Sequence, residues 1–426
     1  MRKKGILICI AVLLFMTAFY VTSIEGKADE KLVIVIDPGH GGENLGGQYE
    51  QYVEKELNPI VAQAMKEELE KYEGVEVYLT RETDIDMSIK DRAKFAKEKN
   101  ADFLFCLHFN MSVKHDLFGA EVWVPATGEY YSKGYAFAEI QMQEFTDLGL
   151  YSRGIKTRLN DRDQNYYGIL RYCTEEGIPS ALIEHCHLDH AADQPFYQEG
   201  EEQLRELGRM DATAVAKYFG LKSDTLGVDY RDYPVSNISI PSGIVRPDET
   251  APELCSIEVE SVDQETGEVI VRIEAKDAES YIQYYSYSTN GGNYYSDLQT
   301  WPRPEAWNRS QDENRVTIQL PFDRDIELRV SAYNGFDKWT ESNIVSISPI
   351  TDPQRLADEL EKAREDAIQK KQQSYKEIVY EETTQPKQPS IIPVIIIIII
   401  LILCIVIISI IMLRRIMHLL KRNKRR

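Results

Sequence analysis

The chain has 426 residues, with 49 basic and 69 acidic side chains and a formal net charge of −20 at pH 7. The length predicts two or three domains rather than one, and a hydrophobic content of 43% excludes a wholly disordered chain. Residues 1–28 carry a net charge of +3 and the last 13 residues carry +7, which leaves −30 for the residues between them. So acidic a middle excludes DNA or RNA as the partner, because nucleic acids bind positively charged surfaces.

The first 28 residues are typical of a secretory signal peptide. Met1–Lys4 is basic, Gly5–Val21 is uncharged and mostly apolar, and Gly26 and Ala28 are small residues where a signal peptidase cuts. An uncleaved anchor is the alternative, because the apolar run is near the lower limit of about 17 residues for a membrane span.

A second apolar run, Ile391–Leu413, contains no charged residue and predicts a transmembrane helix. The basic segment 414–426 follows it, and the positive-inside tendency places such a tail in the cytoplasm. We therefore expect a protein anchored in the cell membrane, with residues from about 29 to 390 outside.

The region 31–220 alternates strand-like and helix-like patterns, which predicts an α/β domain with a mostly parallel sheet and helices on both faces. The expected strands are residues 32–37, 75–80, 101–109, 119–124 and 180–185, and the expected helices are 56–72, 89–99, 136–148 and 201–219. In such folds, functional sites collect at the carboxyl ends of the strands.

After a proline-containing linker at 221–250, the sequence pattern of the expected extracellular region changes. Residues 251–350 show short alternating strands and turn signals, which predict an all-β sandwich. The phrase LRVSAYNGFDKWTESN resembles the last hairpin of a fibronectin type III or immunoglobulin-like module. Residues 351–390 are charged and helical and then proline-bearing, as expected for a stalk.

Three expected strands end in groups that could bind a metal or catalyse a reaction. His40 follows the first strand in a glycine-rich turn, His108 ends the third, and Glu184 lies in the last, while Glu54 precedes a helix. Alone, each histidine could equally be satisfied by backbone groups, and Glu54 could be a solvated carboxylate. Together, two imidazoles and a carboxylate are a ligand set for hydrolytic zinc, which keeps an open coordination position.

These residues stand in motifs that resemble the zinc-dependent N-acetylmuramoyl-L-alanine amidases of the amidase type 3 family. The matching stretches are VIVIDPGHGGENLGG, Glu54–Asn58, Thr80-Arg81 with Arg92, His108–Asn110 and Ala181–Glu184, in the family's order over about residues 32–220. The resemblance implies His40, Glu54 and His108 as ligands of Zn²⁺ and Glu184 as the catalytic carboxylate.

The chain departs from the family pattern at two places. Asn44 stands where the family usually has Asp, and the family's Leu-Gly-Phe after the catalytic Glu is replaced by His185–His190. We expect the histidines of this segment to be polar loop residues lining a groove, with a substrate contact or second metal as the alternative. Asn44, Asn110, His185 and His187 are the residues that could contact the substrate or orient the ligands.

The four ectodomain cysteines could pair or stay free, and the sequence leaves both states open. Cys106 and Cys186 each lie two residues from a site residue, so we expect both to lie close to the metal. The other two are Cys173 and Cys255.

The resemblance implies hydrolysis of the amide bond between N-acetylmuramic acid and L-alanine in peptidoglycan. Two alternatives are a degenerate wall-binding or scaffold protein and a zinc peptidase of another family. The intact set of four site residues argues against the first, and the absence of HExxH argues against the second. The β-sandwich could bind the wall, bind a protein, or serve as a spacer.

Overall fold

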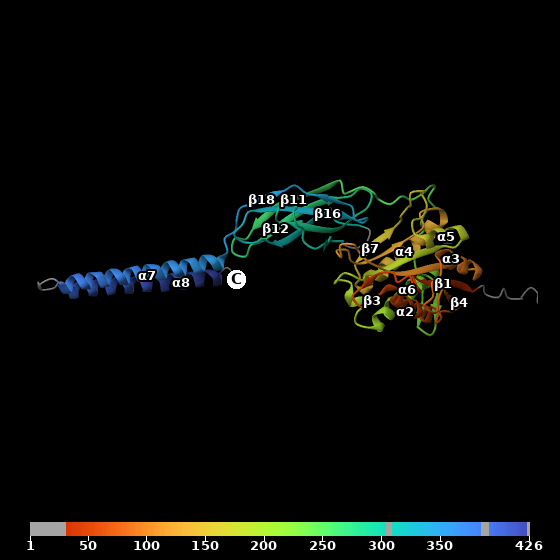
Figure 1. Cartoon of the computed structure of the whole chain (residues 1–426), viewed down its shortest axis with the longest axis horizontal. Helices are drawn as coiled ribbons and strands as arrows, with labels where there is room; N and C mark the ends of the chain where they lie inside the picture. The colour runs from red at the N-terminus through yellow and green to blue at the C-terminus, as the bar shows by residue number, and fades with distance from the viewer. Residues whose placement is uncertain (1–30, 304–308, 385–391, 424–426) are drawn as a thin grey trace, which may run out of the picture. The chain divides into compact units, whose positions relative to one another are not determined.

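In the computed structural model, residues 31–303, 309–384 and 392–423 are described, so the expected signal peptide lies outside the described residues. The chain divides into two compact units, Met1–Ile350 and Thr351–Arg426. Figure 1 shows their helices and strands in chain order.

The first unit opens with a six-stranded sheet in the order β4-β1-β5-β8-β6-β7. Neighbouring strands are parallel from β4 to β8, whereas β6 pairs antiparallel with β8 and parallel with β7. The prediction of a mostly parallel sheet is confirmed, with a reversed pair at one edge. The strands are β1 (Leu32–Pro38), β4 (Val75–Leu79), β5 (Phe103–Asn110), β6 (Ala120–Trp123), β7 (Ser152–Lys156) and β8 (Ser180–His187).

Helices cover both faces of this sheet, as the alternating pattern predicts (Figure 1). One hydrophobic core joins the sheet to α2 (Glu54–Leu69), α4 (Gly128–Leu148) and α6 (Glu201–Phe219). A second core on the other face joins it to α3 (Ile89–Glu98) and α5 (Gly168–Glu176). Strands buried on both faces explain why β1 reads as a continuous apolar run.

Local signals explain where the helices begin and end. Ser88 caps α3 by accepting a hydrogen bond from the backbone amide of Asp91 at 3.2 Å. Gly149 ends α4 in the left-handed region, with φ of 93°, where a residue without Cβ avoids strain.

In the helices and in strand β7, the structure differs from the expected elements. Helix α4 begins at Gly128 rather than at residue 136, and β7 and α5 were not predicted. Strand β7 has the sequence SRGIK, whose Arg153 and Lys156 are buried beside a carboxylate instead of facing solvent. A strand that buries charges lacks the apolar alternation by which strands are recognised.

The linker lies along the first domain. After the two-residue strands β9 (Lys222–Ser223) and β10 (Val228–Asp229), no helix or strand is assigned until Leu254. The amide of Val245 donates to the carbonyl of Ala126 at 2.8 Å, and Ser132 Oγ donates to the carbonyl of Ser239 at 3.2 Å. Three further short elements, β2 (Gln48–Tyr49), β3 (Tyr52–Val53) and the 3₁₀ helix η1 (Gln194–Phe196), lie in loops of the first domain.

Residues 254–347, here called the β module, contain two antiparallel sheets. The first consists of β11 (Leu254–Val262), β12 (Glu268–Lys276) and β15 (Glu313–Gln319). The second consists of β13 (Ile282–Ser288), β14 (Gln299–Thr300), β16 (Ile326–Asn334), β17 (Trp339–Glu341) and β18 (Val345–Ile347). Apolar side chains from both sheets form one buried core, including Val271 of β12 and Val330 of β16.

The second unit contains two long helices, α7 (Pro353–Thr384) and α8 (Ile392–Asn423). Among the described residues, Ile392–Arg415 of α8 is the one segment long and apolar enough to cross a membrane, with a mean hydropathy of 4.0. Helix α7 matches the expected charged helical stretch.

Candidate metal centre

His40 lies in the turn directly after β1, with a left-handed backbone φ of 61°. The guanidinium of Arg92 holds this turn, since Nη1 donates to Asp37 Oδ1 at 2.7 Å and to the carbonyl of Pro38 at 2.9 Å. Its Nη2 donates to the carbonyl of His40 at 2.6 Å. Three charge-assisted hydrogen bonds therefore support a backbone conformation that is unfavourable for a residue with a Cβ.

Arg81 ties the same turn to helix α2. Its Nε and Nη2 donate to the carbonyls of Pro38 and Gly39, both at 2.9 Å. Nη2 also donates to the carbonyl of Lys55 at 3.0 Å, which would otherwise lack its helical partner because Pro59 has no N–H. Arg81 thereby fixes the start of α2 against the loop that carries His40.

Glu54, the first residue of α2, is buried between the two histidines. Its Oε1 lies 2.8 Å from His108 Nδ1 and its Oε2 lies 3.0 Å from His40 Nε2. The carboxylate also accepts hydrogen bonds from the amides of Gly47 at 2.7 Å and Phe109 at 3.0 Å. Burial raises the pKa of Glu54, but the hydrogen bonds to His108 and His40 lower it more, so the group stays ionised.

The three side chains fit a metal ion by their chemistry. One ligand atom from each of His40, Glu54 and His108 lies within 4.8 Å of the others. His40 Nδ1 donates to Asn44 Oδ1 at 2.9 Å, which leaves the lone pair of Nε2 facing a carboxylate oxygen. A proton or a metal ion between Nε2 and the carboxylate stabilises this contact, and two imidazoles with a carboxylate are ligands that zinc prefers.

Glu184 lies beside this cluster on strand β8. It is the register partner of His108 on β5, and paired residues of adjacent strands share a face of the sheet. Its Oε2 is buried and has no hydrogen-bond partner in the described part of the chain. Burial, together with the negative charges of Glu54 and Glu121, raises the pKa of Glu184 well above its usual value.

A cavity of about 320 Å³ opens over these four residues. Helices α3 and α5 supply part of its wall, including Ile89 and Ile169, and Tyr167 precedes α5. The cavity combines apolar walls with a few convergent polar groups, which is typical of a substrate site.

The expected polar loop after Glu184 is wrong, because β8 continues through His187 and both His185 and His187 are buried. His185 faces α6, where Nε2 lies 2.8 Å from Asp211 Oδ2, and its Nδ1 donates to the carbonyl of His108 at 3.1 Å. His185 therefore supports the strand that carries His108 and lies outside the cavity lining. His190 stacks on Phe118 with ring centroids 4.7 Å apart.

A bulge between β5 and β8 changes the sheet face toward which the residues after Glu184 point. The register shifts after His108, so Asn110 pairs with His187 on the face that carries Glu184. Cys186 turns instead into the core under α2, α4 and α6, so the expectation that it lies near the metal is wrong. Cys106 does line the cavity, where its Sγ donates to Asp37 Oδ2 at 3.1 Å. All cysteines of the described residues are unpaired.

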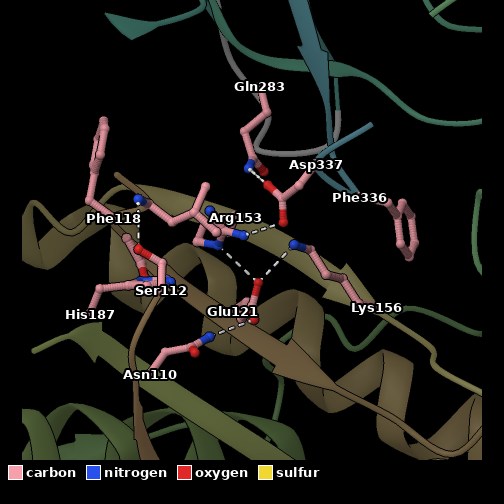
Figure 2. A network of polar contacts seen from close by, with 12 residues as sticks. Asn110, Ser112, Phe118, Glu121, Arg153, Lys156, His187, Gln283, Phe336 and Asp337 are labelled. Atoms are coloured by element: carbon pink, nitrogen blue, oxygen red, sulfur yellow. Dashed lines mark hydrogen bonds and ion pairs between the residues drawn. The ribbon is translucent and has the colours of Figure 1, made fainter. Parts of the chain in front are cut away.

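A buried ion network lies next to Glu184, and no local sequence pattern indicates it (Figure 2). Glu121 on β6 is the register partner of Glu184 and accepts from Arg153 Nε at 2.9 Å and Lys156 Nζ at 2.7 Å. Arg153 Nη2 donates to Asp337 of the β module at 2.8 Å. Burial raises the pKa of Glu121, but the charges of Lys156 and Arg153 lower it more, so the net shift is downward. The network links the module to the residues beside the cavity.

Two histidines, a carboxylate and a neighbouring unpaired carboxyl on an α/β sheet define a candidate metal-dependent hydrolase centre. The family model described as N-acetylmuramoyl-L-alanine amidase matches residues 34–216. The sporulation-specific N-acetylmuramoyl-L-alanine amidase of Bacillus subtilis is 30% identical over 193 residues, which cover 44% of this chain and 69% of that protein. The chain therefore belongs to the N-acetylmuramoyl-L-alanine amidase family.

Two further similar proteins match less than half of this chain. The amidase LytC of Bacillus subtilis is 27% identical over 160 residues, which are 38% of this chain and 30% of LytC. The catalytic domain of CwlV from Bacillus (Paenibacillus) polymyxa is 26% identical, with a TM-score of 0.39, and the match covers 45% of this chain and 99% of that structure.

Proposed function

We propose that this protein is a zinc-dependent amidase that hydrolyses the bond between N-acetylmuramic acid and the L-alanine of the stem peptide in peptidoglycan. The observation that carries this proposal is the cluster of His40, Glu54 and His108 beside the unpaired carboxyl of Glu184. The names of the relatives support the substrate class, and the acidic charge of the chain is compatible with a substrate other than nucleic acid.

His40, Glu54 and His108 would hold the zinc ion. Zinc at such a site supplies Lewis-acid polarisation of a carbonyl and lowers the pKa of a water molecule. Asn44 fixes the tautomer of His40, since its Oδ1 accepts the Nδ1 proton and leaves Nε2 free to coordinate. The backbone amides of Gly47 and Phe109 keep Glu54 in place.

Glu184 would move the proton. Its buried Oε2 has no partner among the described residues, so this oxygen is free to accept the proton of the attacking water. Burial and the charges of Glu54 and Glu121 raise the pKa of Glu184 above its usual value, and a raised pKa favours a carboxyl group that returns a proton to the leaving amine.

The remaining parts of the chain would place this site at the cell wall. We infer that residues 1–28 direct export, that the β module is a β-sandwich, that α7 is a stalk and that the apolar part of α8 anchors the protein in the membrane. Two sheets around one core support the sandwich, and the hydropathy of Ile392–Arg415 supports the anchor. An enzyme tethered in this way would act outside the cytoplasm.

The test uses the full chain purified in detergent micelles and a muropeptide of defined composition. We expect one atom of zinc per chain, and mass spectrometry should detect a free stem peptide with an N-terminal L-alanine. Removal of zinc with a chelator should abolish the release, and added zinc should restore it. A chain that binds peptidoglycan and releases no peptide would instead support the wall-binding alternative.

A further inference from the structure

A second cavity, of about 410 Å³, lies where the first domain, the linker and the β module meet. We propose that it is a subsite for the carboxylate-bearing peptide part of the substrate, completed by Lys338 of the β module. This inference rests on the proposed function for the identity of the peptide.

The second cavity adjoins the candidate metal centre on the same face of the sheet. Glu121 lines the second cavity and is the register partner of Glu184, which lines the first. Tyr167 lines both cavities. Because adjacent strands lie about 4.8 Å apart and an extended peptide advances about 3.3–3.6 Å per residue, a peptide of three or four residues can reach from one cavity into the other.

The floor of the second cavity offers a buried hydrogen-bond acceptor. His187, which is 1% exposed, donates from Nδ1 to the carbonyl of Gly119 at 3.0 Å. This tautomer leaves Nε2 as an acceptor, and no described residue donates to it. Burial lowers the pKa of His187 to about 3, so the ring is neutral at physiological pH. An amide N–H of a peptide is a suitable donor for this nitrogen.

Most of the charged side chains inside the second cavity are paired with one another. Glu121 and Asp337 both bind Arg153, and Figure 2 shows these side chains directed toward one another. Asp248 is held by neutral donors, including Ser280 Oγ at 2.7 Å, and forms no ion pair with a described residue. These groups therefore shape the wall, and the cations that can meet a ligand lie at the exposed rim.

The exposed rim carries two cations without a carboxylate partner among the described residues. Arg158 lies over the ring of Tyr166, with 3.8 Å from its guanidinium carbon to the ring centroid, and Lys338 forms no ion pair with a described residue. Glu249 is the one acidic side chain of the lining that is exposed. At this rim, two cations without an ion-pair partner face one exposed anion, which favours a ligand with a carboxylate.

The β module fixes the backbone of Lys338 at the edge of the second cavity. The turn between β16 and β17 is fixed by Asn334, whose Oδ1 accepts from the amides of Phe336 at 3.0 Å and Lys338 at 2.9 Å. Asp337 in the same turn binds Arg153 of β7. A backbone that is ordered before binding lowers the conformational entropy that is lost when its side chain meets a ligand.

The test measures binding of a synthetic tetrapeptide that begins with L-alanine and carries a free glutamate carboxylate. The full chain in detergent micelles is titrated with this peptide in a calorimeter at low salt. We expect Lys338→Ala and Arg158→Ala each to weaken binding about threefold to tenfold. Lys276→Ala, which removes an exposed lysine of the module outside the cavity, should change the dissociation constant less than twofold. Circular dichroism of each variant checks that it is folded.

A second peptide, in which the carboxylates are amidated, tests whether Lys338 acts through its charge or through the shape of the cavity. The unaltered chain should bind this amidated peptide about as weakly as Lys338→Ala binds the peptide with free carboxylates. Binding of the amidated peptide to Lys338→Ala should be little weaker still. Undetectable binding of the free peptide, or equal affinity in Lys338→Ala and the unaltered chain, would overturn the subsite. If the binding pattern holds while no muropeptide is cleaved, the proposed function fails and the subsite stands.

Discussion

His108 and Glu184 are direct register partners on the parallel strands β5 and β8. The pairing brings a candidate metal ligand and an unpaired buried carboxyl to the same face of the sheet. Since both side chains project from a hydrogen-bonded sheet rather than from a loop, their separation is fixed by the backbone.

The first prediction separates metal binding from proton transfer. His40→Ala, Glu54→Ala and His108→Ala should each lose zinc, because each removes a ligand. Glu184→Gln should keep zinc and lose about 10²- to 10⁴-fold in turnover, since an amide cannot carry the proton. Zinc analysis and muropeptide cleavage measure the two effects. Glu67→Gln, on the exposed side of helix α2, is the control. A Glu184→Gln chain without zinc would show that the division of roles is wrong.

The second prediction concerns Asn44, whose Oδ1 accepts from His40 Nδ1 at 2.9 Å. Asn44→Ala should weaken zinc affinity about 10- to 100-fold, because the ring loses the partner that fixes its tautomer. Asn44→Asp should retain the affinity, since a carboxylate accepts the same proton. Competition with a fluorescent chelator measures both. Equal affinity in Asn44→Ala and the unaltered chain would show that the contact does not orient His40.

The third prediction concerns the space next to His108. A Cβ added at Gly39 would lie 2.3–2.7 Å from three atoms of the imidazole, so Gly39→Ala must displace the ring. We expect a loss of zinc with the fold retained. Gly243→Ala is the matched control, because a Cβ there meets nothing within 4 Å. Zinc content measures the loss of the metal in the two variants, and circular dichroism checks that both are folded. Full zinc in Gly39→Ala would contradict the tight packing.

The fourth prediction follows from the buried neutral ring of His187. Its pKa is about 3 in the folded chain against an ordinary value of 6.5, so the unfolded chain binds one more proton between these pH values. The free energy of unfolding should therefore fall as the pH falls from 6.5, by up to about 1.4 kcal/mol per pH unit relative to His187→Gln. Glu121, Arg153, Lys156 and Asp193 surround the ring and are common to both chains.

Urea denaturation of the full chain in detergent at pH 7, 6 and 5 measures this difference. Burial raises the pKa of Asp193 to about 6, so Asp193 stabilises the fold as the pH falls, which is opposite to the effect of His187. Because both chains contain Asp193, its contribution cancels when their free energies of unfolding are compared. A constant stability difference between the two chains across these pH values would mean that His187 takes up its proton as readily in the folded state as in the unfolded state.

The fifth prediction is the membrane topology. The apolar part of α8 should leave the metal centre outside and residues 414–426 inside, because the run contains no charged residue from Ile392 to Leu413 and basic residues follow it. Protease treatment of intact cells with a tag at each end of the run is the measurement. Digestion of a C-terminal tag from outside would contradict this orientation. A chain truncated at about Lys387 should be secreted and active, since no site residue lies beyond that point.

The sequence by itself determined the class of the first domain and the four residues of the candidate centre. Strand β1 is an uninterrupted apolar run, and a strand of that kind is buried on both faces wherever it lies. His40, Glu54, His108 and Glu184 stand in motifs whose order and spacing are specific. Periodicity and motifs are local properties of the sequence, so they can be recognised without knowing which residues pack against them in the fold.

Only the tertiary structure decided which face each residue after Glu184 occupies. A single bulge turns Cys186 into the core and brings His187 to the side of the candidate centre, and the sequence pattern carries no mark of an extra residue. The sequence likewise predicts that the charged residues of β7 are exposed to solvent. In the structure they are buried, because Glu121 and Asp337 form ion pairs with them. The physical reason is that burial of a charge depends on a partner from a distant part of the chain, and only folding brings that partner within reach.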